Sequence, residues 1–274
     1  MIPVSPRPAE PGRSPPGRSG GWDRGRTVRL GGRDVPLIRF TRSPPVAAVA
    51  EALTEAGLPV GQRPVVVLVG GAAGLETEDR VAWEALFRDG LVAGLLRAGA
   101  CLVDGGTDTG VLALAGAARA ATGADYPAVG VVAEGTVRWP GRVPLVDDAA
   151  ELGPQHTHVV AVPGSEWGLD PPWISLVAGA LAGSAGSCTV VINGGRITLD
   201  DVRRSLAAGR RTLVVAGTGR LADTLADARR DRAGAAPEEA ALARSPLLDI
   251  VDGLRDPRCL ADAIAALAGP ARSG

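Results

Sequence analysis

Ala100-Cys101-Leu102-Val103-Asp104-Gly105-Gly106-Thr107-Asp108-Thr109-Gly110 is the stretch that decides the fold, and Val111-Leu112-Ala113-Leu114-Ala115-Gly116-Ala117-Ala118 follows it. An apolar run, a glycine turn and an alanine-rich run predict a strand, a tight loop and a helix. The first turn of a helix leaves backbone N–H groups unpaired, and Gly105 and Gly106 let the backbone approach a ligand. The stretch therefore predicts an anion-binding loop, or a plain turn in which Thr107 or Asp108 caps the helix.

The composition is that of a globular chain with an aliphatic core. Hydrophobic residues make up 46% of the 274 residues, whereas aromatic residues make up only 3%. All 29 basic residues are arginine, which excludes the lysine chemistry of Schiff bases and P-loops. The formal net charge of −1 gives no general attraction to nucleic acid. The three scattered cysteines predict neither a disulfide framework nor a zinc site.

Composition also divides the chain into four segments. Residues 1–26 are rich in proline, arginine and glycine and are expected to be a disordered tail. Residues 27–58 predict a hairpin and a helix packed on the core, residues 59–232 the main domain, and residues 233–274 a helical extension. The longest apolar runs reach about half of the ~20 residues that span a membrane, so we expect a cytoplasmic protein.

The main domain alternates between apolar strands and helical segments. The strands are expected at 64–69, 100–104, 128–132, 158–162, 189–192 and 211–216. The helices are expected at 77–98, 110–121, 171–183 and 198–208, with another from 220. Continuous apolar strands that alternate with helices indicate a parallel sheet covered on both faces. The predicted fold class is therefore α/β, a Rossmann-like, open and mostly parallel sheet with helices on both faces.

Five glycine-containing turns follow five of these strands, at 70–74, 105–110, 133–135, 194–196 and 217–220. In a parallel sheet all of them lie at one edge, where open α/β sheets bind ligands. Arg196 and Arg220 stand at helix starts, where a cation opposes the helix dipole. A bound anion explains such a placement, and a guanidinium fits phosphate. The expected ligand is thus an anionic, phosphate-bearing small molecule.

The candidate ligand-binding residues all lie in or beside these turns. They are Gly70, Gly71, Gly105, Gly106, Thr107, Asp108, Thr109, Gly110, Glu134, Gly164, Ser165, Glu166, Gly194, Gly195, Arg196, Thr198, Gly217, Thr218, Gly219, Arg220 and Asp223.

Several side chains have two interpretations. Asp201 either completes a capping box that begins at Thr198 or contacts a ligand's ribose. Asp223 orients Arg220, accepts from a ribose hydroxyl or makes a plain surface pair. His156 and His158 share a face if both lie on a strand. We expect them to line the ligand or support structure and predict no metal, because zinc needs three or four ligands.

Two tryptophans also differ in their expected roles. Trp167 follows the strand at 158–162 together with Glu166, and both side chains are placed to close over a base or a ribose. Trp173 lies in a mostly apolar helix and is expected in the core rather than as a stacking platform.

Three segments resemble the LSDAT family of the SLOG superfamily, which includes the DprA/Smf and LOG proteins and the N-terminal region of TRPM cation channels. They are Asp104-Gly105-Gly106-Thr107-Asp108-Thr109-Gly110-Val111, the strand opened by Gln155-His156-Thr157-His158, and Gly217-Thr218-Gly219-Arg220-Leu221-Ala222-Asp223. The resemblance implies a Rossmann-like fold that senses a nucleotide-derived ligand such as ADP-ribose. It also implies a separate membrane effector as a partner. A homo-oligomer is a further expectation, and no cofactor is required.

Two motifs also resemble the LOG enzymes, which cleave the N-glycosidic bond of nucleoside monophosphates. Gly105 to Gly116 resembles their Gly-Gly-Gly-x-x-Gly-Leu-Met-Gly run, and Asn193 to Asp201 lies where they carry Pro-Gly-Gly-x-Gly-Thr-x-x-Glu. Here Asn193 replaces the proline, Ile197 the third glycine and Asp201 the glutamate. The first expectation is therefore a ligand sensor. The alternative is a phosphoribohydrolase in which Asp201 is catalytic.

Overall fold

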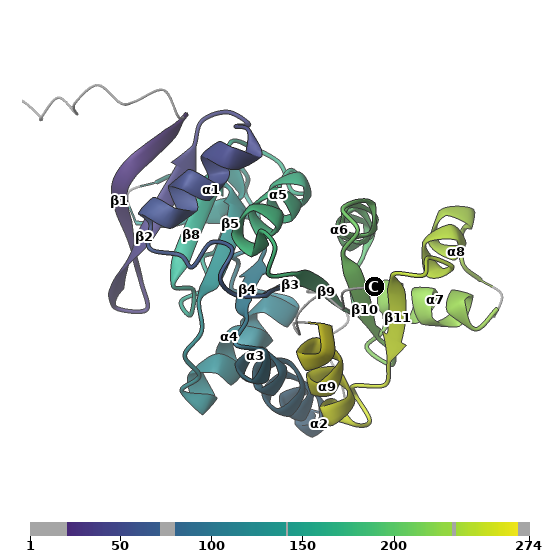
Figure 1. Ribbon diagram of the computed structural model, residues 1–274. Helices are drawn as coiled ribbons and strands as arrows, with labels where there is room; N and C mark the ends of the chain where they lie inside the picture. The colour runs from purple at the N-terminus through teal and green to yellow at the C-terminus, as the bar shows by residue number, and fades with distance from the viewer. Residues whose placement is uncertain (1–20, 72–79, 141, 232–233, 268–274) are drawn as a thin grey trace, which may run out of the picture.

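The computed structural model describes all residues except 1–20, 72–79, 141, 232–233 and 268–274. In the described part, nine strands form one sheet in the order β1-β2-β8-β5-β4-β3-β9-β10-β11 (Figure 1). The strands are β1 (Trp22–Leu30), β2 (Arg33–Phe40), β3 (Val65–Gly70), β4 (Cys101–Asp104), β5 (Ala128–Ala133), β8 (His158–Val162), β9 (Ser187–Ile192), β10 (Arg211–Val215) and β11 (Leu248–Val251). Only β1 pairs antiparallel, with β2. The predicted Rossmann-like, mostly parallel sheet is confirmed.

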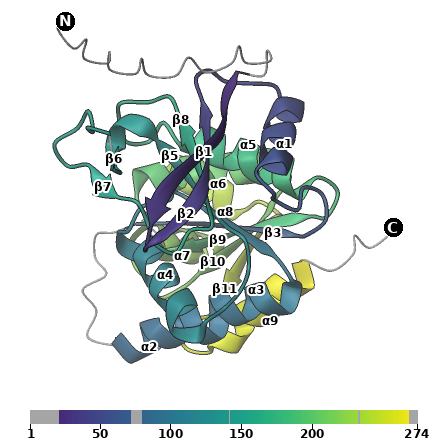
Figure 2. The same ribbon diagram turned by 90° about the vertical axis from the view of Figure 1, so that its left-hand side faces the viewer.

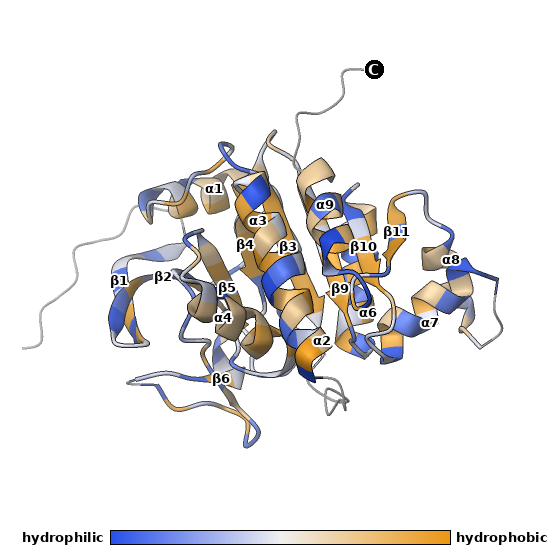
Figure 3. Cartoon of the chain, turned by 90° about the horizontal axis from the view of Figure 1, so that it is seen from below, coloured by the Kyte–Doolittle hydropathy of each residue, from blue (hydrophilic) through white to orange (hydrophobic). Residues whose placement is uncertain are grey.

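Helices cover both faces of this sheet (Figures 1 and 3). One face carries α1 (Val46–Glu55), α5 (Pro171–Ala182), α6 (Arg196–Ala207), α7 (Arg220–Arg229) and α8 (Pro237–Ala243). The other carries α2 (Arg80–Ala85), the π-helical η1 (Leu86–Val92), α3 (Ala93–Ala98), α4 (Gly110–Thr122) and α9 (Pro257–Leu267). None of the helices in the described ranges is long and apolar enough to cross a membrane.

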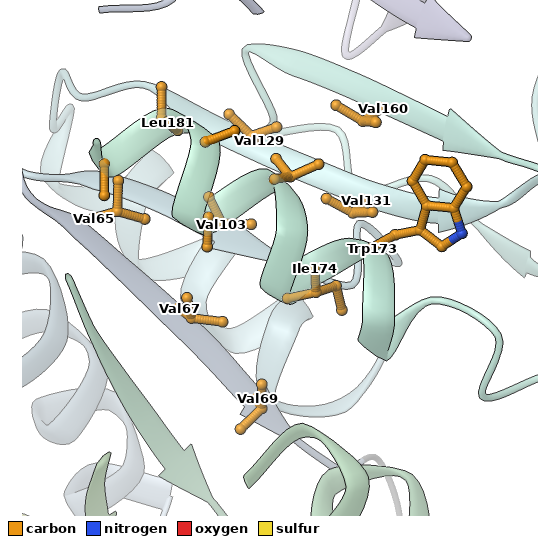
Figure 4. Close-up of a cluster of buried hydrophobic side chains, with 14 of the residues drawn as sticks. Val65, Val67, Val69, Val103, Val129, Val131, Val160, Trp173, Ile174 and Leu181 are labelled. Carbon is orange, nitrogen blue, oxygen red and sulfur yellow. The ribbon is translucent and has the colours of Figure 1, made fainter. Parts of the chain in front are cut away.

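The core between α5 and the sheet is aliphatic, as the composition predicts. Figure 4 shows Ile174 and Leu181 of α5 over valines of β3, β4, β5 and β8. Val129, Val131 and Val160 of those strands are fully buried. These β-branched side chains fill the pleated surface well, so the apolar strands become the central strands of the sheet.

Trp173 also belongs to this core. Its indole is 8% exposed and packs against Phe40, with ring centroids 5.6 Å apart. The expected core position of Trp173 is therefore confirmed, and this tryptophan does not serve as a stacking platform.

The long helix expected at 77–98 is described from Arg80 onward and contains the π-helical turn of η1. Trp83, Phe87, Leu91 and Leu95 are all buried, as their four-residue spacing predicts. The helix ends at Gly99, whose φ of +60° is the left-handed cap expected there.

Two segments differ from the sequence expectation. The hairpin begins at Trp22 rather than at 27, because Trp22 and Asp23 pair with Phe40 and Arg39 across a bulge. The predicted tail 1–26 thus overlaps β1, and its first 20 residues lie outside the described ranges. The C-terminal segment is not wholly helical, because residues 248–251 form β11 beside β10. A four-residue edge strand is too short for its period to stand out among helical patterns.

The order of the strands creates a switch point at the middle of the sheet. From β3 the chain adds β4, β5 and β8 on one side, then returns to place β9, β10 and β11 on the other side of β3. The connection between β5 and β8 includes the small pair β6 (Val137–Arg138) and β7 (Ala150–Glu151), which lies outside the main sheet (Figure 2). Ligands of open α/β sheets bind at such a switch point, beyond the carboxyl ends of the strands.

Candidate ligand-binding site

A cavity of about 560 Å³ opens at this switch point, beyond the ends of β3 and β9. Nine of the predicted candidates line it together: Gly70, Gly71, Gly105, Thr107, Thr109, Gly195, Arg196, Thr198 and Arg220. The wall is completed by Leu68, Val69, Leu112, Asp148, Ala150, Trp167, Asp170, Ile174, Ile197 and Asp201. Residues 72–74 of the first predicted turn lie outside the described ranges.

Two helices begin at this cavity without a side-chain cap. The N-cap of α4 is Thr109 and that of α6 is Gly195, and neither makes a capping hydrogen bond with its side chain. The expectation that Thr107 or Asp108 caps α4 is therefore wrong. Helix α6 begins two residues before Thr198, so Asp201 lies in its second turn and completes no capping box. In α4 the N–H groups of Val111 and Leu112 donate to the carbonyls of Gly71 and Thr109 at 3.4 and 3.2 Å. The dipoles of both helices and the first N–H groups of α6 favour an anion here.

Arg220 brings a guanidinium into the same part of the cavity. A Cβ built on Gly71 would lie 3.1 Å from its Nη1, and one built on Gly195 would lie 2.8 Å from its Nη2. The two glycines therefore make room for this side chain. The side chains of Arg220 and Arg196 form no ion pair or hydrogen bond with any residue in the described ranges, and both residues are exposed. An arginine held over open glycine loops without a carboxylate partner is available to a bound anion.

Arg220 also has an unusual backbone. Its φ is +52°, in the left-handed region that a side chain with a Cβ rarely adopts. The N–H groups of Leu221 and Ala222 donate to the carbonyls of Gly194 and Asn193 at 3.3 and 3.2 Å. The first turn of α7 is thus tied to the loop after β9. It contributes the Arg220 side chain to the cavity rather than free N–H groups.

Asn193 joins the loops after β9 and β10. It is fully buried with φ +58°, its N–H donates to Thr218 Oγ1 at 2.9 Å, and its Nδ2 donates to the Thr218 carbonyl at 2.9 Å. Its Oδ1 accepts from the N–H of Gly194 at 2.6 Å. Strained backbone that is fixed by several hydrogen bonds is typical of functional sites.

Asp223 braces the loop after β10 rather than contacting the cavity. Its two carboxylate oxygens accept from the N–H groups of Gly217 and Gly219 at 2.6 and 3.1 Å. The predicted residues Gly217, Thr218, Gly219 and Asp223 therefore hold Arg220 in place and do not line the cavity themselves.

Replacing Gly195 with alanine is expected to weaken phosphate binding about tenfold, the loss of one hydrogen bond to a charged group. The new methyl would overlap Arg220 Nη2, which lies at the far end of a flexible side chain. We therefore expect the guanidinium to move away from the added methyl group while the fold of the protein is unchanged. Isothermal titration with ADP-ribose measures the change. Gly179→Ala on α5 is the matched control, because a Cβ there meets no atom within 4 Å.

The other end of the cavity is acidic. Asp170 is the N-cap residue of α5, and Asp201 projects from α6. Burial raises the pKa of both carboxyl groups, and the charge of Asp170 raises the pKa of Asp201 further. The Asp201 side chain is 8% exposed as a residue, and its Oδ1 has no hydrogen-bond partner among the described atoms. Buried carboxyl oxygens normally accept a hydrogen bond, so this oxygen lacks an expected hydrogen-bond donor.

Asp201→Asn is expected to stabilise the protein by about 1–3 kcal/mol near pH 8, because it removes a negative charge that burial and the neighbouring Asp170 disfavour. The folded-state pKa of Asp201 is raised. Its destabilising effect is therefore absent below the unfolded pKa of about 3.9 and grows as the pH rises toward the folded value. Urea unfolding at pH 4 and pH 8 measures this change. The gain should disappear at pH 4, and an equal gain at both pH values would contradict the assignment.

Apolar side chains line the mouth between these two ends. Trp167 is 40% exposed and Ile197 is 42% exposed, and both contribute to the cavity wall. Trp167 is therefore placed to cover a flat apolar group, whereas Glu166 does not line the cavity.

Several predicted candidates lie elsewhere. Glu134 is 5% exposed and forms ion pairs with Arg39 and Arg142, so it fixes β2 to the connection after β5. The candidates Gly164, Ser165 and Gly110 are not in the cavity wall, and Asp108 lines a separate cavity of about 180 Å³ beside α4. Gly194 holds a φ of +104°, and a Cβ there would meet Thr198 Oγ1 at 2.8 Å. It shapes the loop without lining the cavity.

The two histidines do not share a face. His156 precedes β8 in a turn, whereas His158 begins the strand and its Nε2 donates to the carbonyl of Ala56 at 3.1 Å. His156 Nδ1 donates to the carbonyl of Gly153 and its Nε2 donates to Asp104 Oδ1, each at 2.9 Å. Burial lowers the pKa of His156, but Asp104 and the hydrogen bonds outweigh burial and raise it.

His156 therefore supports the loop after β4, and no ligand set for a metal occurs in the described ranges. Asp104 Oδ1 also accepts from the N–H of Gly106 at 2.7 Å. The expected structural role of this histidine agrees with these contacts.

Sequence reasoning missed Asp170, although a signal was present. Asp170 directly precedes Pro171 and Pro172, and an acidic residue before a proline at the first helical position is a typical N-cap pattern. Its place opposite Asp201 depends on how α5 and α6 pack across the sheet, which no local pattern shows.

The fold and the cavity define a Rossmann-like α/β domain with a cavity at its switch point. Comparison with family models gives the same class: the LSDAT family of prokaryotes, described as SLOG in TRPM, prokaryote, matches residues 63–260. This match covers more than half of the chain, and the protein belongs to that family. Membership associates the domain with nucleotide-related binding at the level of the family. No curated protein matches the chain.

Proposed function

We propose that this protein binds a nucleotide-derived, phosphate-bearing ligand such as ADP-ribose and acts as a ligand sensor. The observation that carries the proposal is the Arg220 guanidinium, which lies over Gly71 and Gly195 without an ion-pair partner in the described ranges. The N-termini of α4 and α6 border the same cavity. The Arg220 guanidinium and the N-termini of two helices together form a suitable site for a phosphate or pyrophosphate.

The remaining walls support a ligand larger than a phosphate ion. A volume of about 560 Å³ lies within the usual range for small-molecule sites. Trp167 offers an aromatic surface at the mouth, and Leu112 and Ile197 add apolar contacts. A nucleotide derivative combines an anionic group, a polar sugar and a flat base. The cavity presents a chemical partner for each of them.

A thermal-shift screen with ADP-ribose, ADP and AMP tests the proposal, and adenosine serves as the control without phosphate. A ligand at 100 times its dissociation constant stabilises the folded state by about 2.7 kcal/mol, which raises the melting temperature measurably. We expect a shift with at least one phosphate-bearing compound and a much smaller one with adenosine. No shift with any of the three would overturn the proposal.

A second candidate function is hydrolysis of a nucleoside monophosphate, as in the LOG enzymes that the sequence resembles. The position of Asp201 favours it, because this carboxyl group lines the cavity and burial raises its pKa, as is typical of carboxyl groups that act as general acids. The same mixtures are therefore analysed for free base. Base release that Asp201→Asn abolishes would establish the hydrolase. Binding without release of free base would favour the ligand sensor over the hydrolase.

A further inference from the structure

We propose that Asp170 and Asp201 together bind the vicinal hydroxyl groups of a ribose in the ligand. This inference deepens the proposed function and rests on it. Two helices supply the carboxyl groups, α5 through Asp170 and α6 through Asp201, and both side chains line the same cavity as Arg220.

The Asp201 carboxylate lacks a partner on its own chain. The residue is 8% exposed, and Oδ1 is buried without a hydrogen bond to any described residue. The nearby Arg204 is bound to Asp200, with Nε 2.7 Å from Oδ2. The charged groups that act on Asp201 are Asp170 and Asp200, which repel its negative charge, and Arg204, which attracts it. A buried oxygen of this kind requires a donor from outside the chain.

The two carboxyl groups of Asp170 and Asp201 determine which kind of ligand group can bind at this end of the cavity. A carboxyl oxygen that carries no proton accepts hydrogen bonds, so a ligand group that pairs with Oδ1 of Asp201 must supply an O–H or N–H donor. A phosphate group supplies mainly acceptor oxygens, so a second phosphate does not meet this requirement. A vicinal diol has two adjacent O–H donors, one for each carboxyl group. The described residues contain no group of three or more side chains that could hold a metal ion.

The position of the pair fits a sugar phosphate. Asp170 Oδ2 lies 3.6 Å from the point where a Cβ on Gly105 would stand, so it borders the loop that leads into α4. A phosphate at the first turn of α4 and at Arg220 leaves its attached sugar in the space before Asp170 and Asp201. The base then extends toward Trp167 at the mouth.

Isothermal titration with ribose 5-phosphate and 2-deoxyribose 5-phosphate tests the inference, because the two probes differ by one hydroxyl. We expect the protein to bind ribose 5-phosphate about tenfold more tightly, the effect of one hydrogen bond to a charged group. The substitution that replaces the carboxyl group bound to the 2-hydroxyl, either Asp170→Asn or Asp201→Asn, should remove most of this preference. The other substitution should weaken the binding of both probes, because both carry the 3-hydroxyl. Both substitutions keep the shape of the side chain, and melting curves verify that each variant is folded.

Asp262→Asn is the matched control. Asp262 lies on α9, on the opposite face of the sheet, and pairs with Arg97 at 2.5 Å. Equal binding of both sugar phosphates by the unsubstituted protein would overturn the inference while leaving the proposed function standing. A preference that survives both substitutions, or one that appears only with Mg²⁺, would overturn it as well. Failure of every phosphate-bearing probe to bind would remove the proposed function and this inference together.

Discussion

Arg220→Gly is expected to weaken ADP-ribose binding by about 100-fold without unfolding the protein. The guanidinium is the only group of the described cavity wall that combines a full positive charge with contact to both glycine loops, at Gly71 and Gly195. A bidentate arginine contact to phosphate consists of two charge-assisted hydrogen bonds, and their loss is worth about 2.7 kcal/mol. Isothermal titration measures the loss.

Glycine is the appropriate replacement because of the backbone. The φ of +52° at position 220 suits glycine better than arginine, so Arg220→Gly should leave stability unchanged or raise it by up to about 1 kcal/mol. Arg220→Ala removes the same charge but keeps the backbone strain, and it should bind equally weakly. Arg97→Ala serves as the control, because Arg97 pairs with Asp262 on the other face of the sheet. Undiminished binding in both Arg220 variants would contradict the proposed phosphate site.

Gly106→Ala is expected to destabilise the protein by about 3 kcal/mol or more, through backbone strain and overpacking together. Gly106 has a φ of +69°, and a Cβ there would lie 2.5 Å from Val132 Cγ1 and 3.1 Å from the Cα of Gly130. The loop cannot relax easily, because Gly106 N–H donates to Asp104 at 2.7 Å and its carbonyl accepts from Gly153 N–H at 2.9 Å. Urea unfolding measures the change.

The neighbouring Gly105→Ala provides a matched comparison. Gly105 has no positive φ, and its added Cβ would stand 3.4 Å from Leu112 and 3.6 Å from Asp170, which is ordinary contact. We expect Gly105→Ala to fold normally and to weaken ADP-ribose binding, because the methyl intrudes into the cavity. Gly106→Ala with the stability of the unsubstituted protein would show that this turn is not fixed as described.

Much of the fold could be predicted because its signals are local. The valine-rich run that became β3 and the glycine cap at Gly99 both follow from the chemistry of a few adjacent residues. Strand β11 could not be recognised in this way. Its four residues form a strand because β10 pairs with them, and the pair Arg211–Asp249 joins their exposed sides.

The candidate site was predicted in part for the same reason. Glycine turns after parallel strands must share an edge of the sheet, so Gly71, Gly105 and Gly195 were expected together, and they meet in one cavity. The roles of Glu134 and Asp223 depend on partners that only the tertiary structure supplies, Arg39 for one and the N–H of Gly217 for the other. A carboxylate in a loop looks the same in sequence whether it faces a ligand or a neighbouring arginine.

A crystal structure of the protein with ADP-ribose would test the central claim most directly. We expect a phosphate of the ligand within about 3.2 Å of the Arg220 guanidinium and of backbone N–H groups at the start of α4 or α6. We also expect the ligand to occupy the cavity beyond the ends of β3 and β9. A ligand bound outside this cavity, or a cavity that stays empty at a saturating concentration of ADP-ribose, would contradict it.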